Sequence, residues 1–573
     1  MSTVYFSPYS AIWKHSEIEL AHFYDESFES KNVIFLSCGK IFNFFCNSMA
    51  AYGKNENSSE YDKSHICNLC IKTLKFKKTM FPINVEFVDD YFRDVDRGVV
   101  KQFISSINRE NWQESTFFEI NIGRLALYEI QMRYKLDSLD LDDQVWQYYL
   151  KQLEYCAVVV IAANNFFLKN RIDKVIVYND LYSLNQSFLQ IASKYGAVGI
   201  SLQASGPTND MYSRYSVDTR LVRSNQLFSS PDWTNRKSTP LTAYEVFQIY
   251  RYLISLLKAK SFWVYSKKTQ SIFFRSSMRN HYKIPRKSKV ILLTLSSLDE
   301  IVGEQFQLNK TYSQTTFDQL GMVSKLIDYC TDKPDVFLII RPHPREFTNK
   351  RDNVESLSGK KLIDFFQAQK LPENIYVESN PSKISMYSCF FVSDVVLNII
   401  SSAGIEALAM GIPVVAFENE FFTTYPKELN IYTNSDFIGL DSALQNPNLL
   451  SQNQVLAFRW LWLKFFESNH SKFESKSRIY FKVMNLLRGF YIKYTVVIKK
   501  NADQSDNHLL NHMFKSVSAL LKNFNSVITW FSRRMLKIAT MFKIYSRFNF
   551  KLEKILIKFT IYILKHKVFR VFN

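Results

Sequence analysis

Residues 393–418 read SDVVLNIISSAGIEALAMGIPVVAFE, and this stretch decides the expected fold. The apolar run at 395–397 predicts a buried strand, the small residues 401–404 a tight loop into a short helix, and Gly411 with Pro413 the turn into a second strand. A helix that begins among Ser and Gly residues presents unpaired N–H groups, which suit a phosphate or diphosphate. The same punctuation also occurs in any doubly wound α/β domain, so the stretch alone leaves both interpretations open.

A second stretch with candidate ligand-binding side chains, residues 335–345, precedes the first in the chain. The apolar run 335–340, DVFLII, predicts a strand that leads directly into Arg341-Pro342-His343-Pro344-Arg345. The two prolines restrict the backbone on both sides of His343, so the imidazole is presented with little conformational freedom at a strand end. The two arginines make the segment electropositive, which favours a nucleotide or phosphate.

These two stretches resemble the nucleotide-sugar half of GT-B glycosyltransferases, in particular those of bacterial capsules and surface polysaccharides. Arg-Pro-His-Pro is similar to the His-Pro motif of capsule Kdo transferases, bacterial sialyl- and polysialyltransferases and teichoic-acid glycerophosphotransferases, whose His contacts the nucleotide of a cytidine-linked donor. The resemblance covers roughly residues 3–480. It implies an α/β chain of GT-B fold, with two Rossmann-like domains that face a cleft.

By this resemblance the second half of the chain holds the donor. His343 would contact the nucleotide, although a His between two prolines could also be purely structural. Glu406, one turn after Ser402, could accept hydrogen bonds from ribose hydroxyls. The Ser pair after the strand at 289–295 would approach the phosphates. The expected donor-binding residues are Ser296, Ser297, Arg341, His343, Ser401, Ser402, Gly404 and Glu406.

The first half would hold the acceptor. Residues 173–203 form its clearest βαβ unit, in which the strand KVIVY leads into Asn179 and Asp180, and the next strand ends near Gln203. The resemblance places these three side chains on the acceptor side, whereas Asn-Asp is also ordinary turn chemistry. His15, between the first strand and the first helix, is the first candidate for the catalytic base and Asp180 the second. A surface His at a helix start is the alternative for His15.

Four cysteines near the N-terminus are spaced C-x7-C-x20-C-x2-C, at Cys38, Cys46, Cys67 and Cys70. In a cytoplasmic chain disulfides are disfavoured, and such a set could hold a structural zinc ion. Reduced, partly buried thiols explain the spacing equally well. No cofactor is required for catalysis, because arginines and N–H groups can offset the charge of a leaving phosphate.

The net charge of +19 is unevenly distributed. Residues 507–573 contain nine Lys and four Arg against one acid, Glu553, so this segment alone carries +12. An amphipathic basic helical tail of this kind suits an anionic inner membrane surface, although it could also pack on the enzyme or on a partner. No nucleic-acid reader motif accompanies the charge. With no uncharged apolar run of 18 residues and no secretory signal, we expect a cytoplasmic protein peripherally associated with the plasma membrane.

The expected organisation is an acceptor-side domain at 1–245, a helical linker at 246–284, a nucleotide-sugar-binding domain at 285–490 and the basic tail at 491–573. The expected activity is transfer of a sugar from a CMP-, UDP- or GDP-linked donor onto a growing capsular or surface polysaccharide or a lipid-linked acceptor. A CDP-glycerol-type polyol-phosphate transferase, a UDP-sugar 2-epimerase and a non-catalytic membrane scaffold remain alternatives.

Overall fold

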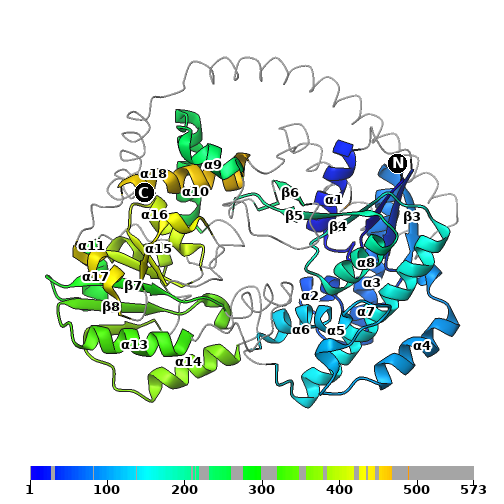
Figure 1. The fold of residues 1–573 in the computed structure, drawn as a ribbon, viewed down its shortest axis with the longest axis horizontal. Helices are drawn as coiled ribbons and strands as arrows, with labels where there is room; N and C mark the ends of the chain where they lie inside the picture. Colours follow the sequence, from blue (N-terminus) through cyan, green and yellow to red (C-terminus); the bar gives the residue numbers. More distant parts are fainter. Residues whose placement is uncertain are drawn as a thin grey trace, which may run out of the picture.

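The computed structural model describes residues 2–467 and Arg488, apart from some segments within this range. The segments left out are 27–31, 82, 137–138, 208–210, 213, 219–230, 260–274, 298–318, 348–355, 379–383, 400, 418–424, 434–435 and 446–450. The predicted basic tail at 491–573 lies outside the described residues. The described strands form two separate six-stranded sheets, which lie side by side in Figure 1.

The first sheet has the strand order β3-β2-β1-β4-β5-β6. Its neighbours pair in parallel except for β5 and β6, which are antiparallel. Its strands are β1 (Ser2–Phe6), β2 (Asn32–Ser37), β3 (Asn84–Phe87), β4 (Lys174–Tyr178), β5 (Val198–Ala204) and β6 (Tyr215–Asp218). The helices of this domain are α1 (Trp13–Glu26), α2 (Asn47–Ala51), α3 (Glu60–Met80), α4 (Asp94–Ser105), α5 (Ile122–Leu125), α6 (Leu127–Tyr134), α7 (Asp143–Lys169) and α8 (Ser183–Lys194).

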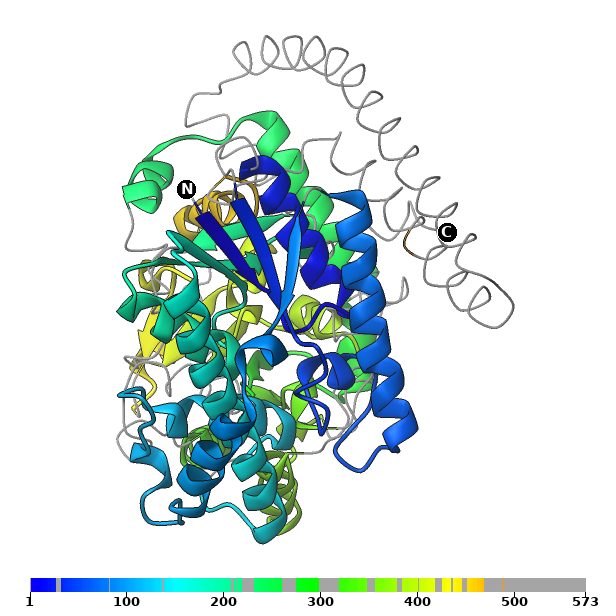
Figure 2. The same cartoon turned by 90° about the vertical axis from the view of Figure 1, so that its right-hand side faces the viewer.

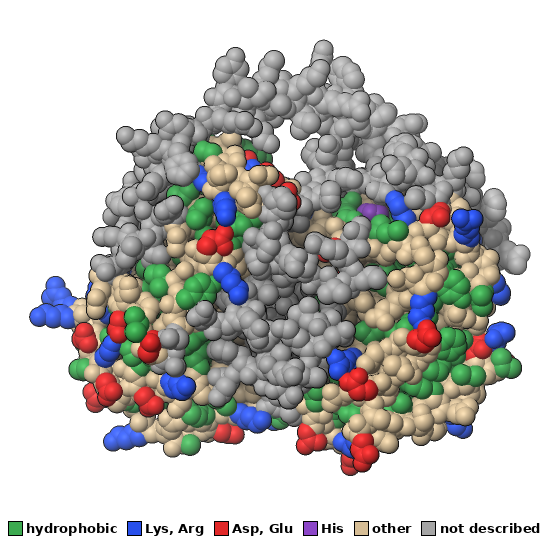
Figure 3. Space-filling model, viewed as in Figure 1, with side chains coloured by type: hydrophobic (Ala, Val, Ile, Leu, Met, Phe, Trp, Pro, Cys, Tyr) green, Lys and Arg blue, Asp and Glu red, His purple; other side chains and the backbone are tan. Residues whose placement is uncertain are grey.

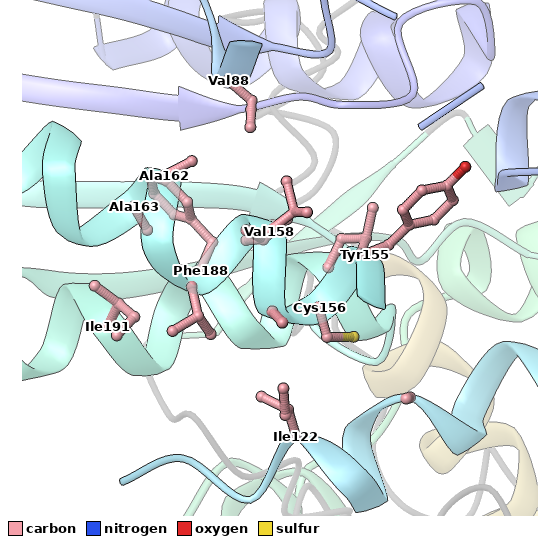
Figure 4. Packing of buried hydrophobic residues seen from close by; sticks show 14 of the residues in the cluster. Val88, Ile122, Tyr155, Cys156, Val158, Ala162, Ala163, Phe188 and Ile191 are labelled. Atoms are coloured by element: carbon pink, nitrogen blue, oxygen red, sulfur yellow. The ribbon is translucent and has the colours of Figure 1, made fainter. Parts of the chain in front are cut away.

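Helices cover both faces of this sheet, so its central strands are apolar on both sides. Tyr5 and Phe35 belong to the core beneath α1 and α3, which Figure 2 shows on one side of the strands. Val4 and Val177 face the other way, into a core shared with α7 and α8. Helix α7 is buried on most of its circumference because it is enclosed by neighbouring helices and the sheet, and Figure 4 shows its side chains packed there.

The second sheet has the order β12-β11-β10-β7-β8-β9, with all pairs parallel. Its strands are β7 (Lys289–Thr294), β8 (Val336–Arg341), β9 (Ile375–Val377), β10 (Val395–Asn398), β11 (Val414–Phe417) and β12 (Ile431–Thr433). The helices around it are α9 (Pro231–Ser238), α10 (Ala243–Leu257), α11 (Arg275–His281), α13 (Gln319–Thr331), α14 (Leu357–Gln367), α15 (Met386–Val392), α16 (Ala403–Ala409), α17 (Ile438–Gln445) and α18 (Ser451–Trp462).

If the six strands of each sheet are numbered 1 to 6 in chain order, the first sheet has the strand order 3-2-1-4-5-6, and the second sheet has the same order when it is read from β9 to β12. This is the strand order of the dinucleotide-binding Rossmann fold. The predicted fold class, two Rossmann-like domains as in GT-B proteins, is thereby confirmed. Each sheet has its switch point where the strand order reverses, between β1 and β4 in the first and between β7 and β10 in the second. In folds of this type, ligands bind beyond the carboxyl ends of the strands at this point.

The chain connects the two domains twice, once through the segment before the second sheet and once through the segment after it. Trp233 of α9 and Val246 of α10 belong to the same core as Val290 of β7, and the Trp233 indole donates a hydrogen bond to Glu428 at 2.7 Å. Arg488 returns to the first domain, where its guanidinium donates to the Thr73 hydroxyl at 3.3 Å. In the part of the chain that the structure describes, no helix is long and apolar enough to cross a membrane.

Candidate functional site

The carboxyl ends of three central strands of the second sheet lie next to one another. Thr294, the last residue of β7, is in register with Arg341 at the end of β8 on one side and with Asn398 at the end of β10 on the other. The Thr294 hydroxyl donates to the Asn398 side-chain oxygen at 3.0 Å. The three segments predicted to bind the donor, which begin at Ser296, Pro342 and Ser401, therefore leave the sheet at one edge beside its switch point.

His343 is half-buried in the segment that follows β8. Its Nδ1 accepts a hydrogen bond from the Arg345 N–H at 3.3 Å, and Pro344 begins a short 3-10 turn, Pro344–Glu346. The local sequence explains this conformation, because the φ of proline suits the first position of a helical turn. The ring of His343 is thus oriented by the main chain of its own segment, as the proline pattern predicts.

The two arginines beside His343 are both buried. The Arg341 guanidinium donates to the Ile384 carbonyl at 2.7 Å and lies 3.9 Å from the Cys389 sulfur, so it points toward the start of α15. Arg345 presents its carbonyl oxygen to the Lys135 ammonium, which comes from the end of α6 in the first domain. Glu346 accepts hydrogen bonds from the Ser356 and Ser358 hydroxyls, which ties the segment to the start of α14.

The loop before α16 is built on Asn398. Its side-chain amide donates to the Ser401 carbonyl at 2.9 Å, and the Ser401 hydroxyl accepts from the Ala403 N–H at 3.2 Å. Ser402 is exposed at the turn, where a ligand can reach it. Gly404 has a packing role, because a Cβ atom there would stand 2.0 Å from the Tyr425 hydroxyl oxygen. Glycine at position 404 therefore allows the loop to approach Tyr425 closely.

Ser296 and Ser297 follow β7 and are both buried. The Ser296 N–H donates to the Gln319 side-chain oxygen at 2.9 Å, so this amide is engaged by the start of α13. The loop that continues from Ser297 lies outside the described residues.

Glu406 is buried with each carboxylate oxygen already engaged. Oε2 accepts a hydrogen bond from the Tyr387 hydroxyl at 3.1 Å, and Oε1 accepts one from the Tyr252 hydroxyl at 3.4 Å. Burial raises the pKa of Glu406 to about 7. A ribose could bind this carboxylate only by taking the place of tyrosine hydroxyls. The sequence gives no local signal for these partners, since they come from α10 and α15.

At the first sheet, His15 lies within α1 and is buried. Its ring stacks on Tyr178, the last residue of β4, with the ring centroids 4.0 Å apart. Burial lowers the pKa of His15 to about 3. His15 is therefore near the strand ends, as predicted, but in a setting that disfavours the acceptance of a proton.

The structure brings Asn179, Asp180 and Gln203 together at the ends of β4 and β5. Asp180 is buried and its Oδ1 accepts from the Ser201 hydroxyl at 2.8 Å and from the Gln203 amide at 3.2 Å. Asn179 has a φ of +62° and accepts the Leu181 N–H at 3.1 Å, which is ordinary Asx-turn geometry. Asp180 thus supports the two strand ends, and its carboxylate is occupied by neighbouring side chains.

Glu129 of α6 also lies near this edge, although no pattern in the sequence marks it. Its oxygens accept the N–H of Ser183, the first residue of α8, at 3.0 and 3.3 Å, and Oε1 accepts from the Asn47 amide at 3.3 Å. Helix α8 directly follows the end of β4, so this carboxylate lies at the strand-end edge of the first sheet. The chain around Glu129 reads only as a helix with charges on one face, which does not distinguish it from its neighbours.

Cys38, Cys46, Cys67 and Cys70 line one pocket, and all four thiols are free. The Lys40 N–H donates to the Cys38 sulfur and the Ala11 N–H to the Cys70 sulfur, both at 3.3 Å. Burial raises the pKa of Cys46 to about 12. Over the described residues, no group of three or more His, Cys, Asp or Glu side chains is arranged to hold a metal ion. The four thiols thus gather without forming a ligand set, and the zinc site stays a prediction.

Comparison with known proteins finds no matching family model and no matching curated protein. Among solved structures, sucrose-phosphate synthase from Thermosynechococcus elongatus is similar with a TM-score of 0.31 and 10% identity, over 85% of this chain and 100% of that chain. KpsC from Thermosulfurimonas dismutans, a beta Kdo 2,4 transferase, has a TM-score of 0.28 and 11% identity, over 50% of this chain and 79% of that chain. The UDP-GlcNAc 2-epimerase from Neisseria meningitidis, bound to UDP-GlcNAc, has a TM-score of 0.25 and 11% identity, over 83% and 98%. Likenesses this distant say nothing about activity, which has to be inferred from the residues of this chain.

Proposed function

We propose that this chain is a glycosyltransferase that moves a sugar from a nucleotide-activated donor to a saccharide or lipid-linked acceptor, as in the synthesis of capsular or surface polysaccharides. One observation carries the proposal. Each domain has a Rossmann-type switch point, and the segments beside the two switch points are joined where Lys135 of the first domain contacts the carbonyl of Arg345 in the second. Reactants bound at the two edges would therefore meet.

The donor would bind at the second sheet, beside Ser297, His343, Ser401 and Ser402. The ring of His343 is already oriented by Arg345, so it can contact a nucleotide without a large entropic cost. The buried guanidinium of Arg341 adds positive charge in a medium of low dielectric constant, where it acts over a longer range than in water. This charge would stabilise the nucleotide phosphate as it leaves.

Three other functions are compatible with the same fold. A polyol-phosphate transferase would bind a cytidine-linked donor and transfer glycerol phosphate in place of a sugar. A UDP-sugar 2-epimerase would need no acceptor, so product that forms in the absence of an acceptor would favour it. A non-catalytic scaffold would bind no nucleotide at all.

Nucleotide binding tests the proposal most directly. We would measure binding of CMP, CDP, UDP and GDP by calorimetry to the wild-type chain, to His343→Ala and to His281→Ala. His281 is an exposed histidine at the end of α11 in the same domain and serves as the matched control. We expect selective binding of one nucleotide, weakened by His343→Ala and unchanged by His281→Ala. If no nucleotide binds at millimolar concentration, the transferase proposal fails.

The nucleotide that the protein binds most tightly indicates the class of donor. A preference for cytidine nucleotides would indicate a Kdo-, sialyl- or glycerophosphate-type donor. A preference for UDP or GDP would indicate an ordinary nucleotide-diphosphate sugar. Unchanged affinity in His343→Ala, together with clear binding to the wild type, would remove His343 from the donor site while leaving the transferase function in place.

We further propose that the protein is cytoplasmic and associates with the anionic inner surface of the plasma membrane through residues 507–573. The support is the charge of this segment, +12 out of the total of +19. On the face drawn in Figure 3, basic and acidic side chains of the described residues are interspersed. The described side chains visible on that face therefore form no comparable basic patch.

A further inference from the structure

Helix α10 turns a face of aromatic and cationic side chains toward the solvent. Tyr244 and Phe247 are exposed to 56% and 53%, although both side chains are large and mainly apolar. Arg251 is exposed as well, and residues that are three, four or seven positions apart share one face of an α-helix. The outer face of α10 is therefore aromatic and positively charged.

The opposite face of α10 fixes the helix on the second domain. Val246, Ile249 and Leu253 belong to the core on one side of the second sheet. Glu245 is the one acid of α10, and it is buried at the start of the helix, where its carboxylate accepts the Thr242 N–H at 2.7 Å in a capping box. Helix α10 is thus a firmly packed amphipathic helix whose exposed face carries no negative charge.

The sequence around α10 is strongly basic. Residues 246–298 contain eleven Lys and Arg and no Asp or Glu, so this stretch carries a net charge of +11. Lys283, Arg286 and Lys287 of this stretch are exposed between α11 and β7. Because Met278 of α11 belongs to the same core as α10, these cations lie on the same side of the second sheet. This side of the second domain therefore attracts anions.

Exposed acids of the same layer are paired with cations. Glu428 contacts Lys237 at 3.9 Å, and Glu467 contacts Arg236. A soluble polyanion would account for the unpaired excess of positive charge, whereas an anionic lipid surface accounts for the charge and for the apolar ring of Phe247. Aromatic rings lie at the headgroup level of membranes, and Lys and Arg side chains are attracted by anionic lipids.

The outer face of α10 adjoins a contact between the two domains. Tyr244 approaches Trp462 with ring centroids 6.5 Å apart, and Trp462 stacks on Phe466 at 4.9 Å. Arg214, between β5 and β6 of the first domain, donates a hydrogen bond to the Phe466 carbonyl at 2.9 Å. Figure 1 shows α10 and α18 on the side of the second domain toward which β5 and β6 extend. A surface in contact with α10 would therefore lie next to a point where the domains meet.

We propose that the outer face of α10, formed by Tyr244, Phe247 and Arg251, is a second membrane contact, which places its aromatic rings among the headgroups of anionic lipids. The inference rests on the proposed membrane association through residues 507–573, and it names the face of the folded domains that meets the lipid. Stable attachment of a peripheral protein takes more than one weak signal. The basic tail supplies the attraction, and α10 sets the orientation of the domains on the surface.

The first test places an environment-sensitive fluorophore on the proposed contact. Phe247→Cys in the full chain would be labelled with a nitrobenzoxadiazole reagent and mixed with vesicles of phosphatidylcholine and phosphatidylglycerol. The native cysteines are buried or half-buried, and burial raises the pKa of Cys46 to about 12, so the exposed new thiol reacts first. We expect the emission to shift to shorter wavelength and to rise in intensity, because the fluorophore leaves the water.

The matched control is Leu168→Cys, which carries the same label at an exposed apolar position at the end of α7 in the first domain, and its emission should not change. Unchanged emission from position 247, while the labelled protein sediments with the vesicles, overturns the α10 contact and leaves the tail as the membrane anchor. If the full chain does not sediment with anionic vesicles at all, the membrane association fails and the α10 contact fails with it.

The second test removes the charge. Arg251→Gln should lower the affinity of the full chain for these vesicles about fivefold, which is the contribution of one cation close to an anionic surface. Lys325→Gln removes an exposed cation of α13, on the other side of the second sheet, and should leave the affinity unchanged. Equal losses in the two variants would overturn the assignment to α10. A shift in emission that occurs without lipid and grows with protein concentration would indicate a second copy of the chain on this face, and would also overturn it.

Discussion

Lys135 donates a hydrogen bond from its ammonium group to the main-chain oxygen of Arg345, and so joins α6 of the first domain to the segment that carries His343 in the second. Both side chains are buried. Lys135 itself has a left-handed backbone conformation, with a φ of +49°, which ends α6 and directs the chain away from the helix axis. The end of α6 is thus fixed against the proposed donor segment.

The first prediction follows from this contact. Lys135→Met removes the charged donor, and a hydrogen bond from a charged group contributes about 1.5–3 kcal/mol. We expect nucleotide release by the enzyme to fall roughly ten- to hundredfold, because the two edges are held together less tightly, while nucleotide affinity stays unchanged. Small-angle scattering should show a larger radius of gyration. Lys169→Met, an exposed lysine at the end of α7, is the control. Unchanged scattering and turnover would mean that the contact does not hold the domains together.

A second prediction concerns the stability of the first domain. The Lys77 ammonium lies 3.0 Å from Glu19 Oε2, both side chains are almost completely buried, and the Ser7 hydroxyl donates to the same oxygen at 2.7 Å. Removing one partner of such a pair leaves an uncompensated charge, at a cost of about 3–5 kcal/mol. We expect Lys77→Met to lower the midpoint of chemical unfolding markedly. The double variant Lys77→Met with Glu19→Gln should recover part of the loss, and no recovery would show that the pair is not the cause.

The sequence predicted the inner strands of both sheets and the edge at which they end. It did not predict the outer strands β3, β6, β9 and β12, nor which side chains meet at that edge. Apolar runs such as 336–340 mark strands that are buried on both faces, and parallel pairing then places Thr294 between Arg341 and Asn398. Glu406 was predicted to bind ribose, whereas the structure gives it tyrosine partners, one of them 154 residues away. Glu129 reaches Ser183 across 54 residues. Such pairings depend on how helices pack, and no local pattern in the sequence encodes them.

A third prediction addresses the basic tail. Deletion of residues 507–573 removes a net charge of +12 and should release the protein from vesicles that contain anionic lipid, while nucleotide binding persists. Because the attraction is electrostatic, binding of the full chain should weaken as salt is raised. Co-sedimentation with anionic and with neutral vesicles measures both effects. Continued binding of the shortened chain would place the membrane contact elsewhere, and equal binding to neutral vesicles would exclude charge as its cause.

The last prediction is the pH dependence that Glu406 gives to folding. Burial raises its pKa from 4.5 to about 7, so the folded state holds this proton more tightly than the unfolded state does. Stability from this carboxyl is therefore fully present below about pH 4.5 and is lost as the pH rises through about 7. Glu406→Gln abolishes the dependence and keeps an acceptor for the hydroxyl of Tyr387 or Tyr252. The free energy of unfolding of the wild type relative to Glu406→Gln should then fall by up to about 3 kcal/mol between pH 4 and pH 8. Glu373 is exposed, so the difference in unfolding free energy between the wild type and Glu373→Gln should not change with pH. A difference for Glu406→Gln that is also independent of pH would show that folding does not shift the pKa of this carboxyl.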